Sequence, residues 1–148
     1  MAVEKNSAQE YLRQVRIYDI QINSLLEEKA QMEALARKVT ASWGSEHVGG
    51  SGNQDKMGDT VAKILDLEKK IDLAVDRFVN KKAEVRGVIE QITNPDHLEL
   101  LLKVYIHYET LEKVACEMGY TYRNACYIHG RALQTVEALL AERQVDHG

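Results

Sequence analysis

The residues best suited to contact a ligand lie in the segment TYRNACYIHGRALQTV, residues 121–136. Arginine can pair bidentately with guanine and asparagine with adenine, so Arg123 and Asn124 are candidates for reading base edges in double-stranded DNA. Arg131, Thr121 and the tyrosine hydroxyls suit phosphate oxygens instead. For the tyrosines, packing onto neighbouring helices is an open alternative. The predicted DNA-binding residues are Thr121, Tyr122, Arg123, Asn124, Tyr127 and Arg131.

The residues just before this segment have the pattern of a helix-turn-helix. Such a motif needs a small residue where its two helices cross, and a residue that tolerates a left-handed backbone in the turn. Ala115 and Gly119 fit these two positions. Thr110 and Thr121 can cap the two helices. The side chains expected to fill the core between the helices are Val114, Met118, Tyr120, Ala125 and Ile128.

This part of the chain also resembles a known family. The last third of the chain, and residues 104–108 before the motif, resemble region four of bacterial sigma factors, with its threonine-led helix, glycine turn and recognition helix ending Arg-Ala-Leu. The resemblance implies that residues 121–136 enter the major groove of DNA. The matching residues are Thr110, Leu111, Glu112, Val114, Ala115, Met118, Gly119, Thr121, Ile128, Arg131, Ala132 and Leu133.

The chain departs from the sigma-factor pattern at two pairs of residues. Primary sigma factors carry Arg-Glu where this chain has Tyr122 and Arg123, and Arg-Gln where it has Cys126 and Tyr127. Recognition of the usual upstream promoter element is therefore not implied. A promoter-melting region is also missing, because the preceding residues have a heptad pattern instead.

The charge of the C-terminal part opposes strong DNA binding by a single copy. Residues 94–148 contain five Lys and Arg but eight Asp and Glu, a formal charge of −3, whereas domains that bind duplex DNA are commonly basic. Residues 121–136 hold two arginines and no acid. We therefore expect useful binding to need a homodimer or a partner such as RNA polymerase.

The N-terminal part has two heptad runs, which predict long helices with a coiled-coil seam. One proline in 148 residues also favours long helices. The first seam consists of Tyr11, Val15, Tyr18, Ile22, Leu25, Lys29, Met32, Ala36 and Val39. The second consists of Met57, Val61, Ile64, Glu68, Ile71, Val75, Phe78, Lys82, Val85, Ile89 and Ile92.

A reversal of the chain in the glycine-rich segment 42–58 would set the two seams against each other. Opposed residue numbers should then sum to about 97, which places Lys29 against Glu68. Pairing would fix the register of an antiparallel hairpin, because an unpaired charge in a seam is costly. The alternative is that both charged heads extend into water at the seam edge.

Ten apolar residues lie off these seams and need a cover. A second copy of the chain is one candidate, since symmetric homodimers are the commonest assemblies. Packing of the C-terminal domain against the hairpin is the other. The off-seam residues are Leu12, Ile17, Ile20, Leu26, Leu35, Leu65, Leu67, Leu73, Val79 and Val88.

Several function classes find no support in the sequence. The apolar runs are too short for a transmembrane helix, and the polar first residues lack a signal pattern, so we expect a cytoplasmic protein with two reduced cysteines. Cys126 and His129 alone make a poor metal site. No arrangement typical of a catalytic site is present, and we expect neither an enzyme nor a cofactor.

Together these features predict an all-α protein in which a long antiparallel helical hairpin, residues 1–93 with a tip at 42–58, precedes a small helix-turn-helix domain, residues 94–148. A heptad arm before such a domain resembles phage and prophage proteins grouped near late-gene transcriptional regulators. We expect a DNA-binding transcription regulator of that kind. The alternatives are a module that docks on RNA polymerase or a sigma factor without binding DNA, and a phage DNA-packaging adaptor.

Overall fold

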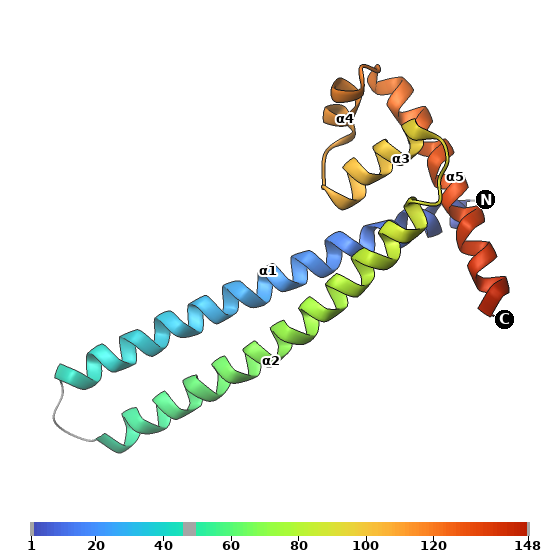
Figure 1. The fold of residues 1–148 in the computed structure, drawn as a ribbon. Helices are drawn as coiled ribbons and strands as arrows, with labels where there is room; N and C mark the ends of the chain where they lie inside the picture. Colours follow the sequence, from blue (N-terminus) through green and yellow to red (C-terminus); the bar gives the residue numbers. More distant parts are fainter. Residues whose placement is uncertain (1, 46–49, 148) are drawn as a thin grey trace. The chain divides into compact units, whose positions relative to one another are not determined.

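The computed structural model describes residues 2–45 and 50–147, and within them every regular element is a helix. Two long helices, α1 (Ala2–Ser45) and α2 (Gly50–Ile89), are followed by the short helices α3 (Pro95–Leu101), η1 (Leu102–Ile106) and α4 (Leu111–Met118) and by the longer α5 (Tyr122–His147). This order confirms the prediction of an all-α hairpin followed by a small helical domain (Figure 1). None of the helices in the described ranges is both long and apolar enough to cross a membrane.

The expected glycine-rich tip is shorter than the segment 42–58. Helix α1 continues to Ser45 and α2 already begins at Gly50, while residues 46–49 lie outside the described residues. A glycine inside a helix costs only about 1 kcal/mol relative to alanine, so a few glycines do not end a helix of this length. The glycine content of the segment therefore overstated the length of the connection.

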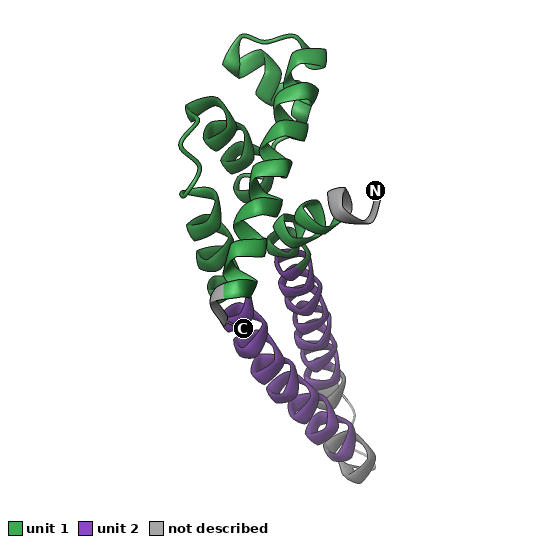
Figure 2. Ribbon diagram, turned by 90° about the vertical axis from the view of Figure 1, so that its right-hand side faces the viewer, with its two compact units in different colours: residues 1–17, 78–148 green, residues 18–77 purple. Residues whose placement is uncertain are grey.

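Residues 18–77 form one compact unit (Figure 2), in which α1 and α2 run antiparallel (Figure 1). The Nζ atom of Lys29 lies 3.4 Å from a carboxylate oxygen of Glu68, as the hairpin register predicted, and 3.6 Å from Glu33 on its own helix. The side chains of Lys29 and Glu68 are 29% and 47% exposed. The pair thus lies at the seam edge in contact with water, where such pairs contribute little stability.

The other compact unit consists of residues 1–17 and 78–148, so the units divide the chain differently from the expected 1–93 and 94–148. The first part of α1 and the last part of α2 belong to the same hydrophobic core as the C-terminal helices. Leu12, Val15, Val85 and Ile89 are fully buried in that core. The physical reason is that the apolar faces of the short helices need a partner surface, which these ends of the long helices supply.

The off-seam apolar residues have two different fates. Leu12 and Val88 are buried in the core that contains the C-terminal helices. Leu67 is half-buried. The other seven are between 45% and 59% exposed: Ile17, Ile20, Leu26, Leu35, Leu65, Leu73 and Val79. The C-terminal helices therefore cover only the off-seam residues of their own unit, and not all of those.

The helix starts of the C-terminal part follow from their capping residues. Oδ1 of Asn94 accepts hydrogen bonds from the backbone N–H groups of Asp96 (3.0 Å) and His97 (3.3 Å). Pro95 is the first residue of α3, where its missing N–H has no helical partner to lose. The hydroxyl of Thr110 accepts from the backbone of Lys113 at 3.3 Å and starts α4.

Between α3 and α4 the chain makes a π-helix, η1, which sequence analysis did not anticipate. The N–H of His107 donates to the carbonyl of Leu102 at 3.1 Å, and that of Glu109 to the carbonyl of Lys103 at 3.0 Å. Tyr108 then adopts a φ of 59°, which is uncommon for a residue other than glycine. These features end the helical run and turn the chain toward α4.

The turn between α4 and α5 is a Schellman motif at Gly119, whose φ is 74°. Tyr120 N–H donates to the Ala115 carbonyl at 2.9 Å, and Gly119 N–H donates to the Cys116 carbonyl at 3.3 Å. Ala115 is 3% exposed, so this small residue sits where the motif requires one. A left-handed glycine therefore sets where α4 ends and α5 can begin.

Replacing Gly119 should test this turn directly. A Cβ at this position meets no atom within 4 Å, so Gly119→Ala adds backbone strain without a clash. We expect a loss of about 1–2 kcal/mol in the free energy of unfolding, measured by urea denaturation. Gly119→Asn should lose less, because asparagine tolerates a left-handed backbone better. Equal stability of Gly119→Ala and the wild type would contradict the strain argument.

Candidate nucleic-acid interface

The first half of α5 presents the predicted DNA-binding residues at the surface. All six are exposed: Thr121, Tyr122, Arg123, Asn124, Tyr127 and Arg131. Tyr122 is 52% exposed and Tyr127 is 61% exposed. Neither tyrosine is therefore buried against a neighbouring helix of the chain.

The opposite face of α5 is anchored in the core. Ala125, Ala132 and Val136 are at most 1% exposed, and Ile128 is 9% exposed. Val114 and Ala115 of α4 belong to the same core, and Met118 and Tyr120 pack against it. Because this side of α5 is held by packing, its other side has a defined orientation toward solvent.

Helical geometry brings four of the six residues onto one face. At about 100° per residue, Arg123, Asn124 and Arg131 all fall within about 60° of Tyr127. Tyr122 lies about 140° from Tyr127, on another side of the helix. Arg123, Asn124, Tyr127 and Arg131 therefore share a single surface, which Tyr122 does not join, and Thr121 precedes the helix.

The side chains on this surface differ in how far they are already engaged. The guanidinium of Arg131 lies over the ring of Tyr127, with 5.7 Å from its Cζ to the ring centroid. Such contacts orient a cation without neutralising it. Arg123 forms no ion pair or hydrogen bond within the described ranges. Both arginines thus keep their charge available for a ligand.

Thr121 and Tyr122 have structural roles as well. The Thr121 hydroxyl accepts a hydrogen bond from the backbone N–H of Asn124 at 3.1 Å and so caps α5. The side chain of Tyr122 interacts with Cys126, and this interaction raises the pKa of the Tyr122 hydroxyl. Thr121 can still donate its hydroxyl proton to a phosphate oxygen.

The face extends along α5 beyond Arg131, the last of the predicted DNA-binding residues. Gln134 is exposed and lies seven residues after Tyr127, so it continues the same stripe. Gly130 lies between Tyr127 and Arg131 on this stripe, and nothing lies within 4 Å of where its Cβ would be. The 3.6-residue period of the segment would have identified Gln134 from sequence.

The charge around the face is more balanced than the C-terminal residues suggest. The whole unit of residues 1–17 and 78–148 contains eleven Lys and Arg against twelve Asp and Glu, a formal charge of −1. Several acids are neutralised in ion pairs, such as Glu117 with Lys103 and with Lys113. Helices α1 and α2 thus supply basic residues that nearly balance the acidic C-terminal segment.

A partly buried polar contact lies on the side of α5 away from the face. The Tyr105 hydroxyl and Nε2 of His129 are 2.7 Å apart, and the two rings stack with centroids 5.8 Å apart. Nε2 of Gln9 donates to the same hydroxyl at 3.5 Å, which leaves the tyrosine proton available for His129. Burial, and then the charge of Arg13, lower the pKa of the His129 imidazole. These bonds join α1, η1 and α5.

A second polar network joins α1, α2 and α5. The Tyr11 hydroxyl donates to Oε2 of Glu84 at 2.6 Å and accepts from Nη1 of Arg143 at 3.0 Å. Burial, and then the Glu84 carboxylate, raise the pKa of Tyr11 to about 12. Arg143, the one arginine of α5 outside the candidate face, is thereby committed to holding the helices together.

The arrangement offers no metal centre among the residues that the structure describes. The spacing of Cys126 and His129 could suit a shared ion, but their surroundings differ. Cys126 is exposed, whereas the His129 ring is packed against Tyr105 and hydrogen-bonded to it. The chemistry of this surface is therefore that of hydrogen bonding and positive charge.

The lowered pKa of His129 makes the stability of the fold depend on pH. The unfolded imidazole binds a proton below about pH 6.5, whereas the folded one resists it, so stability is full above that pH and falls as the pH drops toward the folded pKa. Between pH 7.5 and 5.5 the wild type should lose more free energy of unfolding than His129→Gln, which keeps hydrogen-bonding groups but cannot titrate. Urea denaturation at both pH values measures this, and equal losses would show that His129 does not contribute.

Comparison with known proteins places the chain in a family without assigning it a function. No curated protein and no solved structure matches the chain. The model of one family matches residues 37–137, which is more than half of the chain. That region includes residues 37–45 at the end of α1, all of α2 to α4 and the candidate face on α5. The chain therefore belongs to the DUF1492 family, whose members are described as proteins of unknown function.

Proposed function

We propose that this protein is a DNA-binding transcription regulator of phage or prophage type, and that the first half of α5 enters the major groove. One observation carries the proposal. Arg123, Asn124, Tyr127 and Arg131 lie exposed on one face of a helix, and the opposite face of that helix is buried behind a helix-turn-helix turn. A recognition helix needs one side that is held by packing and an opposite, exposed side that carries polar side chains.

The residues on the face have distinct roles in this proposal. Arg123 and Asn124 lie in the first turn of α5 and read base edges, as residues at the start of recognition helices do. Arg131 and Thr121 contact phosphates and set the register of the helix. The free N–H groups at the start of α5 also favour a nearby phosphate.

The nearly neutral charge of the unit limits the affinity of one copy. Binding by a homodimer, or by a copy held on RNA polymerase, doubles or supplements the phosphate contacts. The same charge favours the second candidate function, a module that docks on RNA polymerase or a sigma factor without gripping DNA. Tests on the arginines of the face distinguish the two.

Removal of either arginine should weaken binding to fragments of the source genome at low salt. We expect Arg123→Ala to reduce affinity by about 5- to 150-fold, the equivalent of 1–3 kcal/mol for a base contact. Arg131→Ala should reduce the slope of log affinity against log salt by about 1. Arg86→Ala, a matched loss of charge on α2, should change little. Fluorescence anisotropy measures all three, and unchanged binding in both α5 variants would favour the docking module.

Gly130 allows stability and binding to be separated. A glycine in an exposed helix interior costs about 1 kcal/mol relative to alanine, so Gly130→Ala should raise the free energy of unfolding by about that amount. Gly87→Ala, in the last turn of α2, is the same substitution away from the face. If the face packs closely on DNA, only Gly130→Ala should also weaken binding. Urea denaturation and anisotropy measure the two effects. Unimpaired binding by Gly130→Ala would mean that DNA does not approach this part of α5.

A further inference from the structure

The hairpin unit of residues 18–77 has its own surface feature, unrelated to α5. Two hollows lie between α1 and α2, with volumes of about 720 Å³ and 370 Å³, and both are lined by Lys70. The two hollows follow one another along the hairpin, with linings that run from Gln21 to Lys38 on α1 and from Lys63 to Arg77 on α2, and we take them together as one groove. We refer to it below as the hairpin groove.

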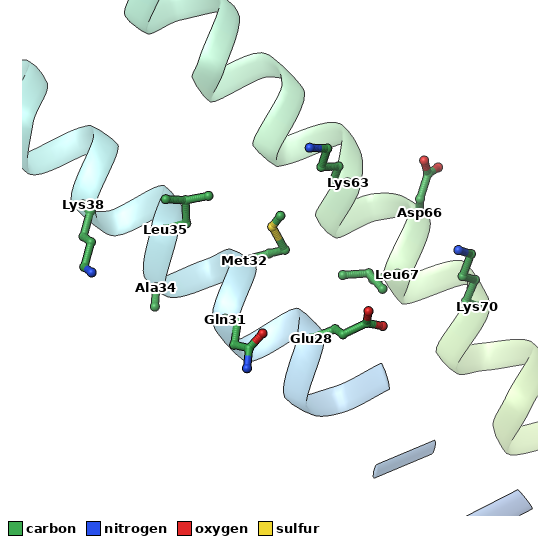
Figure 3. Close-up of a pocket in the computed structure, with 10 residues that line it drawn as sticks. All are labelled: Glu28, Gln31, Met32, Ala34, Leu35, Lys38, Lys63, Asp66, Leu67 and Lys70. Atoms are coloured by element: carbon green, nitrogen blue, oxygen red, sulfur yellow. The ribbon is translucent and has the colours of Figure 1, made fainter. Parts of the chain in front are cut away.

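The floor of the hairpin groove is apolar. Figure 3 shows Met32 and Leu67 pointing toward each other across the space between the two helices, with Leu35 nearby. Leu25 and Ala74 line the smaller hollow. Exposed apolar surface of this kind commonly marks an interaction site.

The seam beneath the groove is poorly covered by the hairpin itself. Among the side chains of residues 18–77 that the structure describes, only Ile22 and Thr60 are buried. Leu25 and Met32 are half-buried although they occupy seam positions, and Val75 is 37% exposed. A third helix laid along the hairpin would cover these seam residues, as in helical bundles.

The rim of the groove selects the charge of such a helix. Four basic side chains but only two acidic ones line it: Lys38, Lys63, Lys70 and Arg77, with Glu28 and Asp66. A second copy that used the same groove would bring like charges together, which is unfavourable. An acidic helix would be attracted instead.

We propose that the hairpin groove binds an amphipathic α-helix of another protein, with an apolar stripe flanked by acidic residues. The helix lies along α1 and α2, places its apolar stripe on Met32, Leu35 and Leu67, and sets its carboxylates against the basic rim. The groove spans 18 residues of α1, or about 27 Å at 1.5 Å per residue. The occupant therefore has about five helical turns. This site is independent of the DNA-binding face.

A pair of designed peptides tests the proposal on the full-length protein. The first is an 18-residue helix with leucines at i, i+3, i+4 and i+7 spacing and glutamates beside them, and the second has lysines in place of the glutamates. We expect the acidic peptide to bind at least about tenfold more tightly in fluorescence anisotropy, because only it complements the rim. Equal affinities would overturn the proposal.

Matched charge reversals locate the binding. Lys63→Glu combined with Lys70→Glu should weaken the acidic peptide by about tenfold or more. Arg37→Glu combined with Lys69→Glu changes the net charge equally, but neither residue lines the groove. This second variant should bind the acidic peptide nearly as tightly as the wild type does. Equal weakening in both pairs would indicate diffuse attraction and overturn the proposal.

Two further measurements separate the remaining outcomes. Leu67→Gln should weaken binding of the acidic peptide while circular dichroism shows an unchanged helix content. Retained affinity would mean that the apolar floor does not contribute to binding and would overturn the proposal.

Sedimentation velocity of the wild type and of the Lys63→Glu, Lys70→Glu variant tests for a second copy in the groove. Self-association lost in that variant would assign the groove to a dimer and overturn the proposal. If self-association is the same in the variant as in the wild type, DNA binding by the variant should also be unchanged, which keeps this test separate from that of the proposed function.

Discussion

The candidate DNA-binding face depends on a single hydrophobic core shared between the ends of the long helices and the C-terminal helices. Residues 94–148 are few for an independent core, because small domains bury a low fraction of their surface. Leu12, Val15, Val85 and Ile89 enlarge that core and are fully buried in it. The buried side of α5 belongs to the same core, so the packing that stabilises the unit also orients the outward face of α5.

Polar contacts add direction to this packing. Hydrophobic burial alone does not specify one angle between helices, whereas partly buried hydrogen bonds require particular partners. Tyr105 with His129, and Tyr11 with Glu84 and Arg143, join helices that are far apart in the sequence. The π-helix η1 and the left-handed Tyr108 end the helical run before α4. The hydrogen bonds and backbone turns of these residues therefore help to fix how the helices of this unit pack against one another.

The two units of the chain differ in how they use apolar residues. The unit of residues 1–17 and 78–148 has a filled core, while residues 18–77 leave most of their seam half-buried or exposed. Under the two proposals, this difference corresponds to two tasks. The packed unit holds a rigid recognition face, and the hairpin keeps apolar surface available for a helix of another protein.

The sequence by itself determined the features that depend on few neighbours. The caps at Thr110 and Thr121 and the turn at Gly119 follow from local hydrogen bonds and backbone preference, and the heptad period with one polar pair set the register of Lys29 against Glu68. Only the tertiary structure decided which apolar residues are covered and at which residues the chain divides into two compact units. Those outcomes depend on contacts between residues many tens of positions apart, and a pattern of local spacing contains no information about which of several apolar surfaces will meet.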